Sequence, residues 1–170
     1  NKNNRGSLMN IGYACLVVGV PGCKIRTCTI KNATSDVLLS LIKSNIETLD
    51  NILDYNIRTG IMLFRISSDI IPFGSHPVNA LNWWDVFSGK LQEIGCKAQS
   101  AGVRLSMHPG QYTVLNSPNP VVVKRALDDL RYHARFLDAM GLSKQHKIVL
   151  HIGGVYGDKP GAINRFIKQY

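Results

Sequence analysis

The stretch LSMHPGQYTVLNSPNP, residues 105–120, decides the fold. It overlaps the end of an apolar run, residues 103–107, that is typical of a buried strand. A proline and a glycine then end the strand and allow the chain to turn. Asn119 followed by Pro120 has the pattern of a helix N-cap with proline at the first helical position. The stretch therefore predicts a strand, a loop that carries His108, and the start of a helix.

The same pattern occurs four times along the chain. We predict strands at residues 9–16, 61–66, 103–107 and 147–152, each followed by a helix that begins near residue 34, 83, 120 or 159. Four consecutive strand–helix units imply parallel strands with right-handed crossovers. The fold class is therefore α/β, either an open doubly wound sheet or part of a (β/α)₈ barrel. The long loops that follow the strands place the functional groups at the carboxyl ends of the strands.

The composition is typical of a single globular domain with a basic surface. The 170 residues are 45% hydrophobic and 18% charged, which excludes a disordered chain. The formal net charge is +9, since 20 lysines and arginines outnumber 11 aspartates and glutamates. This excess favours a polyanionic partner, with nucleic acid first and a membrane surface second.

The cysteines and the termini bear on the cellular compartment. The four cysteines form no CxxC pair, so we expect reduced thiols and neither a disulfide nor a zinc site. No segment has the pattern of a signal peptide or a membrane-spanning helix. We therefore expect a soluble, cytoplasmic protein that does not associate with membranes. Residues 1–8 are expected to be a disordered tail, and residues 9–170 to form one domain.

Three of the five histidines follow the ends of predicted strands, namely His76, His108 and His151. The carboxyl ends of neighbouring parallel strands lie at one rim, so these imidazoles are expected to converge there. Imidazole is the usual ligand of Zn²⁺ and also suits Mn²⁺ and Fe²⁺. Taken singly, each histidine is more simply explained as a hydrogen-bonded loop or core residue. Taken together, their equivalent positions predict a metal site.

Other titratable residues are weaker candidates. A hydrolytic metal site also needs carboxylate oxygens, and Asp69 and Asp158 lie in suitable loops, but neither has a distinctive pattern. His133 lies within a predicted helix, and His146 precedes a strand at the opposite end of the sheet. We expect both of these histidines to be structural.

The loop after the third strand presents Gln111 and Tyr112 side by side. An aromatic ring and an amide can enter a duplex and replace displaced bases, or the tyrosine can pack locally while the glutamine is solvated. Tyr13, at the end of the first predicted strand, is a candidate stacking partner. Lys24 and Arg26 either bind phosphates on the same face or belong to an ordinary solvated loop. The residues alone leave both alternatives open.

Five segments identify a family: MNIGYACL (9–16), LFRISSDIIPFGSHP (63–77), RLSMHPGQYTVLNSPNP (104–120), YHARFLDAMG (132–141) and HKIVLHIGGVYGDK (146–159). Together they strongly resemble the UV-damage endonucleases from about residue 9 to residue 170. The resemblance implies a TIM barrel similar to the xylose-isomerase-like apurinic endonucleases. It also implies a metal-dependent DNA-repair nuclease that nicks the phosphodiester immediately 5′ to a pyrimidine photoproduct and also acts at abasic sites.

The resemblance assigns roles to the candidate residues. It makes His76, His108 and His151 catalytic metal ligands, most plausibly of Mn²⁺, with Mg²⁺ and Zn²⁺ as alternatives. It also assigns DNA contacts. Gln111 and Tyr112 are the probing pair that fills the gap left by a flipped-out damaged dinucleotide, and Tyr13 lines the lesion pocket.

One departure from the family pattern is large. A complete barrel has typically about 250 residues, and only four of its eight units are present here. The family's carboxylate ligands lie in the second half. The expected partners are therefore damaged double-stranded DNA and either the remaining half of the barrel or a second copy. Two other functions stay open: a metal-dependent sugar isomerase on the same barrel, which has no use for Gln111 and Tyr112, and a fragment that binds damaged DNA without cutting it.

Overall fold

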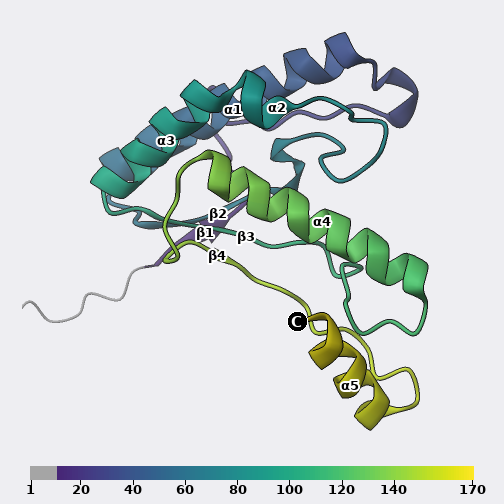
Figure 1. Cartoon of the computed structure of the whole chain (residues 1–170). Helices are drawn as coiled ribbons and strands as arrows, with labels where there is room; N and C mark the ends of the chain where they lie inside the picture. Colours follow the sequence, from purple (N-terminus) through teal and green to yellow (C-terminus); the bar gives the residue numbers. More distant parts are fainter. Residues whose placement is uncertain (1–10) are drawn as a thin grey trace, which may run out of the picture.

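The computed structural model describes residues 11–170, and its centre is a four-stranded parallel sheet (Figure 1). The strands are β1 (Tyr13–Ala14), β2 (Leu63–Ile66), β3 (Arg104–Met107) and β4 (Lys147–Ile148). They lie in the order β1-β2-β3-β4, so each strand pairs with the one that precedes it in the chain. This order is that of four consecutive βα units of a barrel and confirms the predicted fold class. The tail predicted for residues 1–8 lies outside the described residues.

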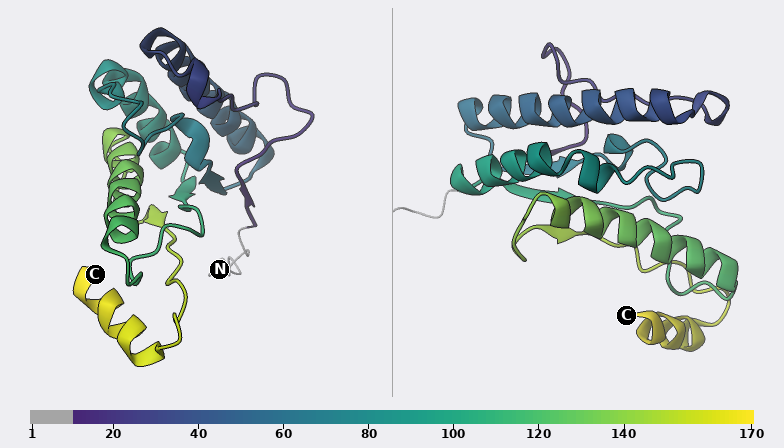
Figure 2. Two further views of the ribbon diagram at one scale, coloured as in Figure 1. Left: turned by 90° about the vertical axis from the view of Figure 1, so that its right-hand side faces the viewer. Right: turned by 45° about the horizontal axis from the view of Figure 1, so that its top comes forward.

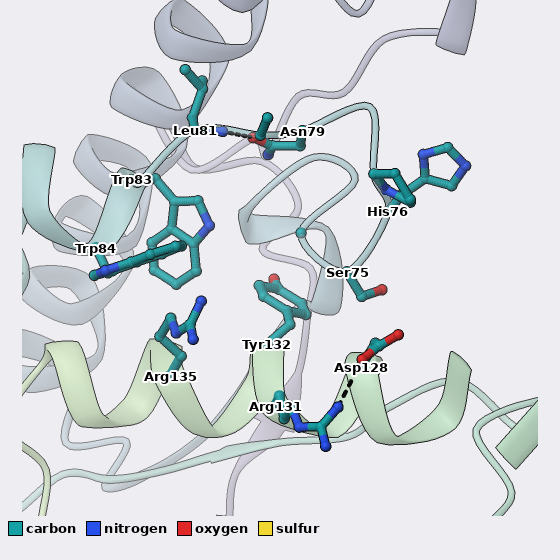
Figure 3. Close-up of a pocket in the computed structure, with 13 residues that line it drawn as sticks. Ser75, His76, Asn79, Leu81, Trp83, Trp84, Asp128, Arg131, Tyr132 and Arg135 are labelled. Carbon is teal, nitrogen blue, oxygen red and sulfur yellow. Dashed lines mark hydrogen bonds and ion pairs between the residues drawn. The ribbon is translucent and has the colours of Figure 1, made fainter. Parts of the chain in front are cut away.

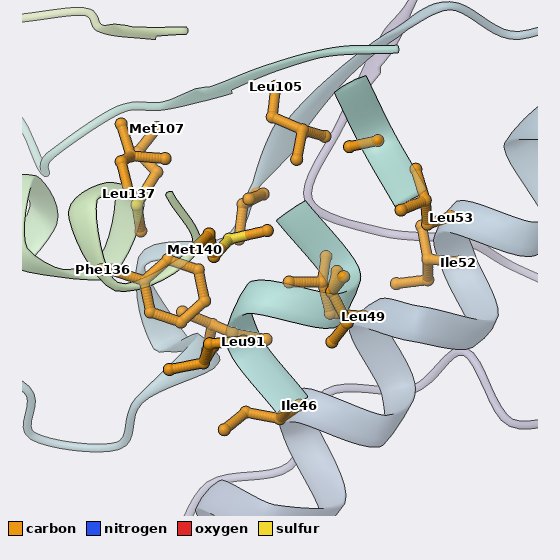
Figure 4. Packing of buried hydrophobic residues seen from close by; sticks show 14 of the residues in the cluster. Ile46, Leu49, Ile52, Leu53, Leu91, Leu105, Met107, Phe136, Leu137 and Met140 are labelled. Atoms are coloured by element: carbon orange, nitrogen blue, oxygen red, sulfur yellow. The ribbon is translucent and has the colours of Figure 1, made fainter. Parts of the chain in front are cut away.

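Helices cover one face of the sheet (Figure 2). The helices of the described chain are α1 (Ser35–Thr59), α2 (Trp83–Val86), α3 (Ser88–Ser100), α4 (Pro120–Ala139) and α5 (Lys159–Gln169), with short 3₁₀ turns at Ile30–Asn32 and Ser68–Ile70. The core lies between this face and α1, α3 and α4, where Leu105 and Met107 of β3 pack near Leu91 and Phe136 (Figure 4). Burial of these apolar side chains is the main force that holds the helices to the sheet.

The helix boundaries follow the capping residues in the sequence. Thr34 caps α1 by accepting a hydrogen bond from the amide of Val37, and Gly60 ends the helix in the left-handed conformation, with φ of 76°. Asn119 caps α4 by accepting a 2.9 Å hydrogen bond from the amide of Val121, with Pro120 in the first turn. The predicted start of the α4 helix is therefore confirmed.

Three predicted elements are shorter than the sequence pattern indicates. The first strand, predicted for residues 9–16, is limited to Tyr13–Ala14 within the described part of the chain. The fourth, predicted for 147–152, ends at Ile148 because it is an edge strand, and a single further bond joins Val149 N to Met107 O. The helix predicted to begin near residue 83 is interrupted at Phe87, which separates α2 from α3.

All four cysteines are free thiols, as predicted. Between residues 11 and 170, none of the helices combines the length and the apolarity that crossing a membrane requires.

The α5 helix packs weakly, because Ala162 is its one buried residue while Ile163 and Ile167 are exposed. It lies apart from the other helices in Figure 1.

Candidate active site

The carboxyl ends of the strands open into the loops that carry the candidate residues. In a parallel sheet these ends lie along one edge, where α/β enzymes hold their reactive groups. The loop after β2 spans residues 67–82, the loop after β3 spans 108–119, and the loop after β4 spans 149–158. Whether the predicted residues meet depends on the course of each loop.

His108 and His151 lie against each other at this rim. Their rings meet edge to face, with centroids 4.5 Å apart and an interplanar angle of 86°. The two residues follow the neighbouring strands β3 and β4. The hydrogen bond from Val149 N to Met107 O holds the start of the loop after β4 beside the end of β3. His151 is exposed and His108 is half-buried, so both imidazoles can be reached by a ligand. The sequence-based prediction that these histidines converge agrees with this placement.

His76 lies elsewhere. Its loop turns back over α4, and its exposed ring accepts a 3.1 Å hydrogen bond at Nδ1 from the amide of Val78. It lines the edge of a pocket of about 380 Å³ and points away from its centre (Figure 3). Trp84 lines the same pocket, where Arg135 stacks on its indole at 4.0 Å, while Trp83 is 2% exposed and packs in the core. Both tryptophans therefore serve packing.

The structure brings together two of the three histidines that were expected to bind a metal ion. Within residues 11–170, no group of three or more histidine, cysteine, aspartate or glutamate side chains is arranged to hold a metal ion. The His108–His151 pair suits a divalent transition metal, but a complete site needs at least one more ligand. Asp158 instead caps α5, where its Oδ1 accepts a hydrogen bond from the amide of Gly161. The described residues therefore do not complete a metal site by themselves.

Gln111 and Tyr112 form the outer turn of the loop after β3. The turn is held by hydrogen bonds from Thr113 N to Gly110 O and from Val114 N to Tyr112 O. Both side chains are exposed, and Tyr112 retains 77% of its accessible surface. Together with His151 they line an open groove of about 770 Å³. The histidine pair and the predicted probing residues thus share one surface.

The other DNA-contact candidates lie on or near β1. The Tyr13 hydroxyl donates a 2.6 Å hydrogen bond to Asn56 Oδ1 of α1, and its ring lies 5.0 Å from that of Phe64, so its polar end is already occupied. Burial raises the pKa of Tyr13. Lys24 and Arg26 are exposed, and neither forms an ion pair with any residue in the described part of the chain.

The two histidines expected to be structural are hydrogen-bonded inside the fold. His146 Nδ1 accepts a 3.1 Å bond from the amide of Leu105. His133 is fully buried, with Nδ1 2.7 Å from the carbonyl of Asp129 and Nε2 2.9 Å from Ser68 Oγ. A carbonyl only accepts, so Nδ1 carries the proton, and burial lowers the pKa of this imidazole.

Sequence reasoning missed a polar cluster on α4 that reaches these loops. Tyr132 donates from its hydroxyl to Ser68 O at 2.7 Å, and the single proton of the Ser68 hydroxyl is shared between His108 O at 3.0 Å and His133 Nε2 at 2.9 Å. Asp129 accepts from two loop hydroxyl groups. The available signal was the spacing of Asp129, Tyr132 and His133, which places them on one face of the helix.

Comparisons with known proteins show which family the sequence matches. The protein-family model described as UV-endonuclease UvdE matches residues 9–170. The UV DNA damage endonuclease of Clostridium perfringens (strain 13 / Type A) is 44% identical over 162 residues, which cover 95% of this chain and 39% of that protein. The protein of the same name from Bacillus cereus (strain G9842) is 34% identical over 167 residues, with 94% and 53% covered.

A solved structure gives the same result for the fold. The crystal structure of SacUVDE matches with a TM-score of 0.90 and 39% sequence identity, and the match covers 95% of this chain and 55% of that one. The chain therefore spans between 39% and 55% of the length of these relatives.

Proposed function

Because the chain belongs to the UV-endonuclease UvdE family, we propose that it provides the first four βα units of a DNA-repair endonuclease for UV-damaged DNA. The bond cut is the phosphodiester immediately 5′ to a pyrimidine photoproduct, which leaves a 3′-hydroxyl and a 5′-phosphate. Abasic sites are a second substrate. The formal net charge of +9 favours binding to such a polyanion.

One observation carries this proposal. His151, which pairs with His108, lines the same groove as Gln111 and Tyr112. A metal-binding imidazole pair beside an exposed aromatic ring suits an enzyme that displaces a nucleotide and cuts next to it. A photoproduct stacks and pairs poorly, so flipping it out costs less than the few kcal/mol that an intact step requires. Gln111 and Tyr112 would fill the gap that the damaged dinucleotide leaves.

The metal requirement is part of the proposal. His108 and His151 are the proposed ligands of a divalent ion, with Mn²⁺ as the first candidate because imidazole nitrogen suits it. His76 joins them only if its loop moves toward the pair. The remaining ligands would come from the length of the relatives that this chain does not span, or from a second copy that completes the barrel. Either partner would also cover the exposed apolar side chains of α5.

A second candidate function is favoured by the incomplete ligand set. The groove and the basic side chains of Lys24 and Arg26 can bind damaged DNA even where no complete metal site forms. These 170 residues would then recognise the lesion without cutting.

The deciding experiment incubates the chain with Mn²⁺ and a duplex that carries one thymine dimer, with an undamaged duplex of the same sequence alongside. Strand breakage 5′ to the dimer that is abolished in His108→Ala would establish the endonuclease. Preferential binding of the damaged duplex without breakage would establish the binding function. Equal binding of both duplexes, again without breakage, would overturn both proposals.

A further inference from the structure

The carboxylate of Asp129 lies between two of the loops at the candidate site. Its Oδ2 accepts a 2.6 Å hydrogen bond from Thr113 Oγ1, and its Oδ1 accepts a 3.0 Å bond from Ser75 Oγ. Each partner directly adjoins a candidate site residue, because Thr113 follows Tyr112 and Ser75 precedes His76. One side chain of α4 therefore bridges the loop after β2 and the loop after β3.

The bond from Thr113 to Asp129 lies in part-buried surroundings, whereas the bond from Ser75 is exposed. Thr113 is 1% exposed, and the side chain of Asp129 is 15% exposed. Hydrogen bonds to a charged and largely buried acceptor are stronger than those between neutral groups. The bridge forms part of the wall of a cavity of about 600 Å³ that is also lined by His76 and Tyr112. Movement of either loop therefore acts on the same carboxylate.

The backbone of α4 is also connected to the loop that carries His108. The carbonyl of Asp129 accepts from Nδ1 of His133, whose Nε2 contacts Ser68 Oγ, and that hydroxyl lies 3.0 Å from the carbonyl of His108. Close packing adds to this contact, since a Cβ on Gly74 would lie 2.4 Å from the Tyr132 ring. The loop that carries His76 thus rests directly on α4, as Figure 3 shows for Ser75 and Tyr132.

We infer that Asp129 is a positioning residue that couples the probing turn of Gln111 and Tyr112 to the loop of His76. This inference rests on the proposed function for its biological meaning, while the coupling itself is a property of the DNA-free chain. When Tyr112 enters a damaged duplex, the pull on Thr113 is transmitted through the carboxylate to Ser75. Lesion recognition and the position of His76 are then linked by two hydrogen bonds.

Hydrogen exchange in the DNA-free chain tests the coupling without reference to activity. The amides of Thr113 and Val114 report on the probing turn, and those of His76 and Val78 report on the other loop, because each donates a hydrogen bond within its own loop. In Asp129→Ala we expect exchange at both sets of amides to accelerate by about tenfold, a change that corresponds to about 1.4 kcal/mol.

The matched control is the neighbouring carboxylate. Asp128 forms ion pairs with Lys124 and Arg131 of α4, and within residues 11–170 it forms no hydrogen bond or ion pair with either loop. Asp128→Ala should leave exchange in both loops within twofold of the parent chain. A general loosening of α4 would instead raise exchange in both variants, and that result would overturn the positioning role.

Substitution of Thr113 separates coupling from independent anchoring. Thr113→Val removes the hydroxyl while Ser75 and Asp129 stay intact, so accelerated exchange at His76 and Val78 can arise only through the carboxylate. Thr113→Ser keeps the hydroxyl and should restore the parent rates. If Thr113→Val changes only the probing turn, the two loops are anchored separately and the inference is wrong.

A DNA experiment distinguishes failure of the inference from failure of the proposed function. The probe is a duplex with one thymine dimer and 2-aminopurine on the opposite strand, whose fluorescence rises when its stacking is disturbed. The parent chain should raise this fluorescence, and Asp129→Ala should lower the response at least threefold while Asp128→Ala does not. No response with the parent chain would reject the proposed function and leave the exchange result standing. A full response with Asp129→Ala would reject the inference and keep the proposed function.

Discussion

The side chain of Asn45 holds the backbone of Arg26 at two points. Asn45 Oδ1 accepts a 2.8 Å hydrogen bond from the Arg26 amide, and Asn45 Nδ2 donates a 2.8 Å bond to the Arg26 carbonyl. The same Nδ2 lies 3.2 Å from the carbonyl of Ile70 in the loop after β2. Since Asn45 is fully buried in α1, it joins two rim loops to the core.

Replacement of this amide should therefore destabilise the protein. Asn45→Ala leaves the part-buried backbone groups of Arg26 and the buried carbonyl of Ile70 without this partner, and we expect a loss of about 2–3 kcal/mol in the free energy of unfolding. Urea unfolding monitored by circular dichroism measures this loss. The matched control is Asn51→Ala on the same helix, because Asn51 makes one exposed 3.2 Å bond to Gly22 O and should change stability by less than about 0.5 kcal/mol. Equal losses in the two variants would contradict the role given to Asn45.

If His108 and His151 bind a metal ion, replacement of either histidine should lower the affinity of the chain for that ion. We expect His108→Ala and His151→Ala each to weaken Mn²⁺ binding at least tenfold, since each removes one of two adjacent imidazole ligands. His76→Ala should change the affinity by less than threefold if its loop stays where the structure places it. Titration with Mn²⁺, in which electron paramagnetic resonance detects the free ion, measures the affinity of all three variants. An effect of His76→Ala as large as that of His108→Ala would mean that the loop moves to complete the site.

The contrast between these histidines shows how far sequence reasoning reaches. The positions of His108 and His151 follow from the strand pattern, because each residue directly follows or closely follows a strand and parallel strands share one rim. His76 is ten residues beyond Ile66, the last residue of β2. Its loop passes through Phe73, whose φ is 55°, and packs on Tyr132, which no local pattern encodes. Spacing alone cannot predict the course of such a loop.

The element boundaries show the same limit for edge strands. β2 and β3 were predicted to within two residues because both are central strands: β2 buries alternate side chains, and β3 buries Leu105, Ser106 and Met107. β4 has one neighbour in the described sheet, so only two of the six residues predicted for it form strand. The Asp129 bridge was also beyond sequence reasoning, since its partners lie 16 and 54 residues away. Long-range hydrogen bonds depend on the finished packing.

The exposed ring of Tyr112 predicts a lesion-specific defect. Stacking of an aromatic side chain on a base contributes about 1–3 kcal/mol, so Tyr112→Ala should weaken binding of a thymine-dimer duplex by roughly 10- to 100-fold. Binding of undamaged duplex should change little, because it depends mainly on lysine and arginine contacts with phosphates. Fluorescence anisotropy at fixed salt measures both affinities. Tyr170→Ala is the control, since that ring is 94% exposed at the end of the described chain. A similar loss on both duplexes would count against a probing role.

The ion-pair cluster between α1 and α3 predicts how stability depends on pH. Asp50 accepts from Lys90 at 2.6 Å and also from Lys97. Burial acts to raise the pKa of Asp50, but the hydrogen bonds from both lysines outweigh it and hold the pKa below 3.8. The hydrogen bond with Asp50 is the main cause that raises the pKa of Lys90 to about 12.

The signs of these pKa shifts define the pH range in which the ion-pair cluster stabilises the fold. A lowered carboxyl pKa stabilises the fold above pH 3.8, and this contribution is lost as the pH falls through the folded-state pKa. A raised lysine pKa stabilises the fold below pH 10.5, and this contribution is lost as the pH rises toward about 12. Asp50→Asn should therefore cost about 1–2 kcal/mol at pH 7, and the difference from the parent chain should be smaller at pH 3 and at pH 11 than at pH 7.

Asp54→Asn provides the control for this experiment. Asp54 also pairs with Lys97, at 2.7 Å, but its side chain is 55% exposed, whereas that of Asp50 is 16% exposed. Exposed pairs are screened by water, so this variant should differ from the parent chain by less than about 0.5 kcal/mol at every pH. Urea unfolding at pH 3, 7 and 11 compares the three proteins. A loss in Asp50→Asn that is constant across this range would show that packing of the side chain, and not its charge, stabilises the contact between the two helices.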